Sequence, residues 1–327
     1  MSLILMSVCT LAEILLADPS IVREGHSYLL VGTEPAPNSV SAKEAVFPVL
    51  KSNDLKTWNP LDSGYPEGRI LPRNVAFGKK FFWAPQLFAR DGKHYFAYTC
   101  EHGWGIAMAD RVEGPYRHLA TMAKGRGRID PFVLQDDDGS VYAYCSDWNL
   151  GGISAVKLKP DMSGFDGEPT LCVKNTESWE KKPLEKRFEE LNAKFGYGED
   201  DAFKCSRGTI EGPTVVKRRG KYVLFYSAND YRSPDYCVGA AVSDTPTGPW
   251  KKLQSGPVLS QAETGFNGTG HGDVFDDNAG NLWYVFHAHN SGIRIHPRRA
   301  GMIRLVESVG ADGYPRYAAD PKSMKLL

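Results

Sequence analysis

Three acidic residues stand at the start of short apolar segments that contain a proline. Asp18 lies in the triplet ADP, Asp130 in IDP and Glu211 in EGP. When carboxyl groups converge, they raise one another's pKa values, so that one keeps a proton near neutral pH while another stays ionised. A hydrolase needs such an acid and base. A turn or a strand cap explains one Asp-Pro pair equally well, so the prediction depends on all three acids occurring at corresponding places.

A fivefold repeat must position these acids. Each copy has a small or acidic residue, a proline or an acidic residue, a few apolar residues, a turn that ends in glycine, and an aromatic run. The copies begin at Asp18, Ala84, Asp130, Gly212 and Gly272. Each copy predicts a β-hairpin, in which two short apolar runs flank an Xaa-Gly turn. Since an isolated hairpin is only marginally stable, the five units are expected to pack on one another.

The repeats predict an all-β fold, a five-bladed β-propeller that forms a single catalytic domain over residues 1–327. Residues 106–109 and 238–243, each followed by a Gly-Pro-aromatic motif, are typical of the third and fourth strands of a blade. Residues 55–58 occupy the similar place in the first unit. The first strands of the blades would line a central channel, where the three acids should meet. On periodicity alone, a β-sandwich is the alternative.

The separation of the acids would determine the stereochemistry of a reaction at a sugar carbon. Carboxyl groups about 6.5–9.5 Å apart leave room for a water molecule and lead to inversion, whereas about 5–5.5 Å leads to retention. Strands on opposite sides of a channel favour the wider separation. We therefore expect inversion, and a retaining reaction that uses the same acids is the alternative.

An irregular segment at about 170–208 separates the third copy of the repeat from the fourth. Within it, residues 182–195 combine helix formers with apolar residues at roughly helical spacing. Pro183 fits the first turn of a helix and Gly196 fits its end. We expect a helical insertion between blades 3 and 4, which would serve either as packing decoration or as a lid or rim element.

Composition excludes several classes of function. Lys and Arg total 39, as do Asp and Glu, which gives no electrostatic case for nucleic acid or an anionic membrane surface. No apolar run reaches the length of about 18 residues that a membrane-spanning helix needs. The six cysteines lack zinc-like spacing and are expected to be free thiols. The first 17 residues are interpreted as structured chain rather than a signal peptide, which leaves a secreted, periplasmic or cytoplasmic location open.

Four motifs in this order resemble glycoside hydrolase family 43, and the similarity extends from Asp18 to about Arg299. The motifs are residues 17–21 (ADPSI), 83–85 (WAP), 129–132 (IDPF) and 210–213 (IEGP). The resemblance implies a five-bladed propeller of inverting enzymes that act on arabinose- and xylose-containing polysaccharides, with some galactan-active members. It also implies that Asp18 is the general base, that Glu211 is the general acid, and that Asp130 raises the pKa of the acid and orients it.

The resemblance implies further site residues. Trp83 would form an apolar wall for a sugar face, with core packing as the alternative. The family has an arginine that reaches the sugar after the last aromatic strand; we assign Arg299 to this place, with Arg298 and Arg294 as competitors. His271 would lie in the substrate site at the entrance of the fifth blade, where a family histidine approaches a water molecule or an ion, often calcium, on the propeller axis. Because calcium prefers oxygen ligands, we expect contact through water.

The chain is therefore predicted to be a glycosidase of the α-L-arabinofuranosidase, β-xylosidase or endo-1,4-β-xylanase type, acting on plant polysaccharides or oligosaccharides. Motifs for a dinucleotide, for a serine nucleophile elbow and for a zinc protease are absent from the sequence. We expect no required cofactor, with calcium as a structural ion, and the oligomeric state is open. The alternatives are a galactan- or fructan-active propeller hydrolase and an inactive carbohydrate-binding propeller.

Overall fold

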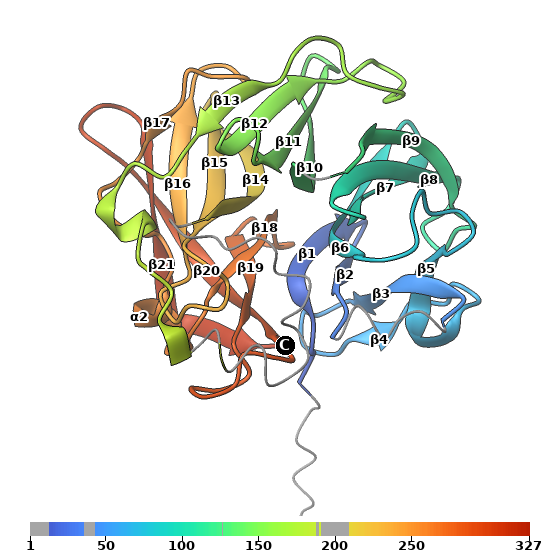
Figure 1. The fold of residues 1–327 in the computed structure, drawn as a ribbon, viewed down its shortest axis with the longest axis horizontal. Coiled ribbons are helices and arrows are strands. Elements are labelled where there is room, and N and C mark those ends of the chain that lie inside the picture. The colour runs from blue at the N-terminus through green and yellow to red at the C-terminus, as the bar shows by residue number, and fades with distance from the viewer. Residues whose placement is uncertain (1–12, 36–42, 126, 188–189, 191–208) are drawn as a thin grey trace, which may run out of the picture.

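The protein is described from a computed structural model that covers residues 13–35, 43–125, 127–187, 190 and 209–327. Over these residues, the chain forms five antiparallel sheets that follow one another around a central axis (Figure 1). The first strand of each sheet contacts the first strands of its neighbours, so these five strands surround the axis. The five-bladed β-propeller predicted from the repeats is confirmed.

Each blade has four strands in chain order, and blade 1 carries an additional strand, β5, that pairs with β3. The strands of blades 1 and 2 are β1 (Ala17–Glu24), β2 (Ser27–Thr33), β3 (Ala45–Ser52), β4 (Asn59–Pro60), β5 (Arg69–Pro72), β6 (Trp83–Arg90), β7 (Lys93–Cys100), β8 (Gly103–Ala109) and β9 (Arg117–Ala123). Those of blades 3 to 5 are β10 (Arg128–Gln135), β11 (Val141–Asp147), β12 (Gly152–Lys157), β13 (Thr170–Val173), β14 (Ile210–Arg218), β15 (Lys221–Ala228), β16 (Cys237–Ser243), β17 (Lys251–Lys252), β18 (Gly270–Asp276), β19 (Leu282–Ala288), β20 (Arg299–Val309) and β21 (Pro315–Leu326).

The proline motifs of the repeat lie at β-bulges in the first strands. In all five blades, the pairing of the first two strands shifts register at the same place, next to the channel. A proline has no N–H to donate, so a bulge is one of the few places in a sheet that tolerates it. The residue before the proline, or before Gly272 in blade 5, has a positive φ in each blade: Asp18 (48°), Ala84 (43°), Asp130 (56°), Gly212 (59°) and His271 (35°).

Apolar side chains fill the space between neighbouring blades, so the core is divided into five clusters. The cluster between blades 5 and 1 includes Ile21 and Phe275, which close the ring. Backbone hydrogen bonds add to this closure: Ile14 donates to Leu327, and Ala300 of β20 donates to Ile14. The C-terminus accordingly lies beside blade 1 (Figure 1). This closure fixes the distance between side chains that come from the two ends of the chain.

The outer strands match the sequence prediction in part. Residues 106–109 belong to β8 and residues 238–243 to β16, whereas the Gly-Pro motifs lie in the turns that lead to β9 and β17. Residues 55–58 have the similar place in blade 1, as expected, because they form the turn between its third and fourth strands, β3 and β4. Asp54 stabilises this turn, since its carboxylate accepts hydrogen bonds from the backbone N–H groups of Lys56 and Thr57.

The segment expected as a helical insertion begins with a strand instead. Residues 170–173 form β13, which pairs with β12 as the fourth strand of blade 3. The helix predicted over 182–195 lies mostly outside the described residues; residues 182–185 have no regular structure, whereas residues 186, 187 and 190 are helical, in line with the prediction. Three further short helices are η2 (Pro66–Gly68), η3 (Ser178–Glu180) and α2 (Gln261–Thr264).

Cys100, Cys145, Cys172 and Cys237 are free thiols, as expected, and the other two cysteines lie outside the described residues. The N-terminal residues 1–12, interpreted from sequence as structured chain, also lie outside them. In the part of the chain that the structure describes, every helix is too short to cross a membrane.

Candidate active site

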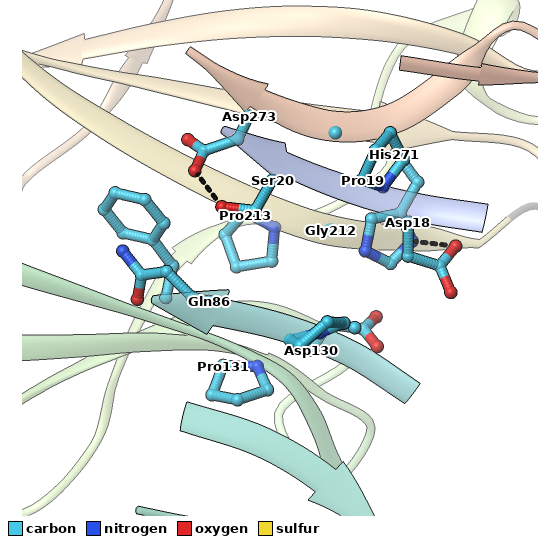
Figure 2. Close-up of a pocket in the computed structure, with 14 residues that line it drawn as sticks. Asp18, Pro19, Ser20, Gln86, Asp130, Pro131, Gly212, Pro213, His271 and Asp273 are labelled. Atoms are coloured by element: carbon cyan, nitrogen blue, oxygen red, sulfur yellow. Dashed lines mark hydrogen bonds and ion pairs between the residues drawn. The ribbon is translucent and has the colours of Figure 1, made fainter. Parts of the chain in front are cut away.

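The three acids predicted from the sequence come from three first strands: Asp18 from β1, Asp130 from β10 and Glu211 from β14. The carboxylates of Asp18 and Asp130 point in the same direction, toward the end of the axis where His271 lies (Figure 2). Asp18, Asp130 and His271 also line a cavity of about 30 Å³ on the axis. This volume has room for about one or two water molecules. The structure therefore brings Asp18 and Asp130 together, and Glu211, which does not line this cavity, lies close enough to both for their charges to act on it.

Glu211 differs from the two aspartates in its place within the repeat. Asp18 and Asp130 are the bulge residues of their blades, and His271 is the bulge residue of blade 5. Glu211 precedes the bulge residue of blade 4, and Trp83 has the same place in blade 2. The sequence analysis treated all three acids as equivalent. The offset of one residue gives Glu211 a different direction of approach to the site from that of the aspartates.

Asp18 is held as an ionised carboxylate. Its Oδ1 lies 3.1 Å from Nη1 of Arg298 and 3.4 Å from Nδ1 of His271, and its Oδ2 accepts a 2.6 Å hydrogen bond from Thr33. Burial raises the pKa of Asp18, but the charges of Arg298 and His271 outweigh burial and hold this pKa well below its usual range. An ionised carboxylate can accept a proton from a water molecule.

Glu211 is poised to carry a proton. Its Oε1 accepts a hydrogen bond of 2.6 Å from the hydroxyl of Tyr236. Burial and the charge of Asp130 raise the pKa of Glu211 to about 7. Burial also raises the pKa of Asp130, although the charge of His271 and a 2.7 Å hydrogen bond from Ser146 oppose the rise. A carboxyl group that titrates near 7 can give its proton to a leaving oxygen near neutral pH.

Two histidines beside Asp18 have opposite charge preferences. Burial lowers the pKa of His271, but the surrounding carboxylates outweigh burial and raise it overall. Burial and the charge of Arg298 lower the pKa of His287 to about 3, so this ring is neutral. His287 stacks on Tyr236 with ring centroids 5.6 Å apart, and its Nδ1 lies 3.3 Å from Oδ1 of Asp18. The neutral ring of His287 thus packs between Asp18 and Tyr236, the residue that donates a hydrogen bond to Glu211.

Comparison with known proteins decides the family. The sequence profile described as "Glycosyl hydrolases family 43" matches residues 11–315. The chain belongs to glycosyl hydrolases family 43. Membership of this family makes the chain a glycosidase, as the resemblance implied.

Relatives of this family 43 glycosidase have several different names. An extracellular endo-α-(1→5)-L-arabinanase of Thermotoga petrophila is 24% identical over 85% of this chain and 67% of its own length. A β-D-galactofuranosidase of Aspergillus niger is 24% identical over 83% of this chain and 73% of its own length. Among solved structures, an endo-1,4-β-xylanase from Bacteroides thetaiotaomicron is 30% identical, with a TM-score of 0.75 over 94% of this chain and 95% of that one.

The arginine next to the carboxylate of Asp18 in this family 43 chain is Arg298. Arg299, which the sequence analysis assigned to the substrate, is turned elsewhere: its Nη1 lies 3.1 Å from Oε1 of Glu13, and its guanidinium lies 4.6 Å from the ring centre of Phe266. Arg294 lies in the loop between β19 and β20. The geometry favours Arg298, and the contact of Arg299 with substrate stays a prediction.

Trp83 and His271 were predicted to contact substrate. Trp83 is half-buried at the start of β6 and packs against Phe81 and His102, with ring centroids 5.2 Å and 5.4 Å away. His271 faces the carboxylate of Asp18. A ring with a raised pKa that faces an acid does not fit a direct metal ligand, and in the described residues no group of three or more His, Cys, Asp or Glu is arranged to hold a metal ion. Calcium reached through water stays a prediction.

The sequence analysis missed the hydroxyl groups that bind the acids: Thr33 on Asp18, Ser146 on Asp130 and Tyr236 on Glu211. A signal for two of them exists in the repeat. Thr33 follows Asp18 by 15 residues and Ser146 follows Asp130 by 16, at the end of the next strand in each case. Tyr236 lies outside the repeated hairpin, in the segment that leads to β16.

Proposed function

We propose that this family 43 glycosidase is an inverting enzyme that hydrolyses arabinofuranosyl or xylosyl linkages in plant polysaccharides or oligosaccharides. Asp18 is the general base, Glu211 is the general acid, and Asp130 raises the pKa of the acid. The observation that carries the proposal is the contrast between the surroundings of two carboxyl groups: Arg298 and His271 flank Asp18 and hold its pKa low, whereas Glu211 is buried near Asp130, and its pKa is raised to about 7. Two carboxyl groups whose environments separate their pKa values are typical of an acid and base pair.

The reaction follows from these two protonation states. A water molecule hydrogen-bonded to Asp18 attacks the anomeric carbon and gives one proton to that carboxylate. The bond between the anomeric carbon and the glycosidic oxygen breaks, and the leaving oxygen takes the proton of Glu211. Attack opposite the leaving group produces a sugar of inverted configuration. The next turnover requires Asp18 to lose its proton and Glu211 to regain one.

The remaining side chains bind the sugar or adjust the protonation of the acids. Asp130 acts through its charge on Glu211, and the positive charge of Arg298 keeps Asp18 ionised. Trp83 offers an apolar face to the sugar from the second blade. His271 helps to balance the negative charges of the three acids. We derive no step through calcium, because His271 does not fit a direct ligand.

The choice of sugar is supported by the relatives named above, an arabinanase and a solved xylanase. The relative named as a galactofuranosidase favours a second candidate, a galactofuranoside, at the same site and with the same acids. Arabinofuranose and galactofuranose share a five-membered ring, so these substrates place the anomeric carbon similarly.

A panel of nitrophenyl α-L-arabinofuranoside, β-D-xylopyranoside and β-D-galactofuranoside tests the proposal, with the product anomer read by proton NMR in the first minutes. We expect hydrolysis of one of the first two, with inversion. Asp18→Asn and Glu211→Gln should fold and should lose hydrolysis of natural oligosaccharides, whereas Asp138→Asn, in an exposed turn of blade 3, should match the wild type. Retention of configuration, or wild-type rates in both acid variants, would contradict the mechanism, and a wild type inert on all sugars would favour the carbohydrate-binding alternative.

A further inference from the structure

A ring of side chain to backbone hydrogen bonds joins the blades at the level of the active site. In each blade, the second strand places one residue opposite the residue that precedes the bulge. The side chain of this residue accepts the N–H of the bulge residue of the next blade. The five bonds are Ala84 to Thr33 (2.9 Å), Asp130 to Thr99 (2.9 Å), Gly212 to Ser146 (3.3 Å), His271 to Ser227 (2.7 Å) and Asp18 to His287 (3.1 Å).

Two members of this ring also bind a catalytic acid. The hydroxyl of Thr33 donates to Oδ2 of Asp18 at 2.6 Å, and the hydroxyl of Ser146 donates to Oδ2 of Asp130 at 2.7 Å. Both hydroxyl groups belong to fully buried residues, at 1% and 0% exposure. Each therefore makes its bonds away from competing bulk water.

The two bonds of each hydroxyl constrain each other. A hydroxyl has one hydrogen to donate, and it accepts through its lone pairs. Because a backbone N–H already points at the oxygen of Thr33, the hydrogen of that hydroxyl is directed to the other partner, Asp18. The same reasoning directs the hydrogen of Ser146 to Asp130. Each carboxylate is thus oriented by the backbone of the neighbouring blade through a single oxygen atom.

The backbone donors adjoin the other residues of the site. Ala84, which donates to Thr33, directly follows Trp83, and Gly212, which donates to Ser146, directly follows Glu211. Thr33 consequently fixes Asp18 relative to the proposed sugar wall. Ser146 fixes Asp130 relative to the proposed general acid. In a propeller whose functional groups come from different blades, such links set the spacing across the channel.

We propose that Thr33 and Ser146 are positioning residues of the hydrolytic site, each of which locks a carboxylate of its own blade to the backbone of the next blade. This inference deepens the proposed function and rests on it for its kinetic test. It assigns to both residues an effect on turnover rather than on substrate binding. Precise placement of the reacting groups contributes to the rate, and small displacements of them are costly.

Thr33→Val and Thr99→Val form a matched pair for the test. Both variants replace a buried hydroxyl by a methyl group and remove one bond between blades, but only Thr33→Val removes a bond to a catalytic carboxylate. We expect Thr33→Val to lower kcat by about ten- to a hundredfold more than Thr99→Val does, as for a hydrogen bond to a charged group. KM should change little. Thr33→Ser keeps the hydroxyl and should restore most of kcat.

Ser146 provides a second, independent comparison. Ser146→Ala removes the hydroxyl, whereas Ser146→Thr keeps it. We expect Ser146→Ala to lower kcat by about tenfold or more, with KM nearly unchanged, and Ser146→Thr to recover most of the loss. Thermal unfolding of every variant shows whether the fold survives. If Thr33→Val or Ser146→Ala fails to fold, the variant that keeps the hydroxyl, Thr33→Ser or Ser146→Thr, still decides. That variant must then fold and turn over at close to the wild-type rate.

Equal losses of kcat in Thr33→Val and Thr99→Val, or a Thr33→Ser variant as slow as Thr33→Val, would overturn the proposal. Crystal structures of these variants separate this outcome from failure of the proposed function, because they need no substrate. We expect the Asp18 carboxylate to turn away from its wild-type direction in Thr33→Val only. A wild type that hydrolyses no sugar would refute the proposed function, and an unmoved carboxylate in Thr33→Val would refute the positioning role.

Discussion

Nη1 of Arg298 lies 3.1 Å from Oδ1 of Asp18, although 280 positions separate the two residues in the chain. Arg298 directly precedes β20 in blade 5, and Asp18 lies in β1 of blade 1, so closure of the propeller ring creates this contact. The guanidinium of Arg298 also lies 4.9 Å from the ring centre of Tyr231, within the range of a cation–π contact. The ionisation of the proposed base therefore depends on the contact between the first and last blades.

Arg298→Met should move the acidic limb of the pH profile of kcat/KM to higher pH. The guanidinium lowers the pKa of Asp18, so its removal raises that pKa and protonates the base over a wider range. We expect a shift of about one pH unit or more, as for loss of an adjacent opposite charge. Arg299→Met, in the neighbouring position, should leave the limb in place. A shift in Arg299→Met alone would restore the original sequence assignment.

Tyr236→Phe should move the basic limb of kcat/KM to higher pH. The hydroxyl of Tyr236 donates to Glu211 and lowers its pKa, so the variant should titrate about half to one unit above the wild type. Tyr116→Phe is the matched control, because the buried hydroxyl of Tyr116 has no hydrogen-bond partner among the described residues. If both variants give the wild-type profile, Tyr236 does not act on the acid.

Asp130→Asn should have the opposite effect on the basic limb. The charge of Asp130 raises the pKa of Glu211, so the variant should lose activity at lower pH than the wild type, whose limb is expected near pH 7. We expect a displacement of about one unit, measured as kcat/KM between pH 5 and pH 9. Asp138→Asn, in the same blade, should leave the limb near pH 7. A limb that moves to higher pH in Asp130→Asn would contradict the assigned role.

Asp273 should make the stability of the fold depend on pH. Burial raises its pKa to about 6, although hydroxyl groups of Ser20 and Thr214 donate to it. The folded pKa exceeds the unfolded value near 3.9, so the protonated carboxyl stabilises the fold fully at low pH, and this stabilisation is lost between about pH 4 and pH 6. Asp273→Asn should therefore gain stability over the wild type across that window.

The gain from Asp273→Asn should reach at most about 3 kcal/mol above pH 6. Urea unfolding of both proteins at pH 4, 5, 6 and 8 measures it. The exposed Asp138→Asn variant should show no such trend. A difference between Asp273→Asn and the wild type that is constant with pH would show that folding does not raise the pKa of Asp273.

The blades and the meeting of the acids were predictable because their signals are local. Pro19 and Pro131 require a place in the sheet that needs no N–H donor, which is the bulge beside the channel. Gly92 occupies a turn with a φ of 72°, which a glycine adopts without strain. The glycine turn recurs in all five blades and the proline in four of them, with Gly272 in its place in blade 5, so the repeat alone predicts which strands share the channel.

The other partners of the acids depend on contacts that no local pattern determines. Successive residues of an extended chain point to opposite sides, so a one-residue difference decides whether Arg298 or Arg299 faces the site. Tyr236 reaches Glu211 from a segment 25 residues away and outside the repeat. Thr33 and Ser146 lie at a regular spacing, but hydroxyl residues at strand ends are common, and only the structure gives their second bond to an acid.

The central claim, that Glu211 supplies the proton and Asp18 accepts one, is tested most directly by varying the leaving group. We would measure kcat of Asp18→Asn and Glu211→Gln on two substrates. One is a dinitrophenyl glycoside, whose leaving group departs without protonation, and the other is the corresponding alkyl glycoside, whose leaving group needs a proton. Glu211→Gln should retain most activity on the first and lose about a hundredfold or more on the second, whereas Asp18→Asn should lose activity on both. Equal losses of Glu211→Gln on the two substrates would contradict the account.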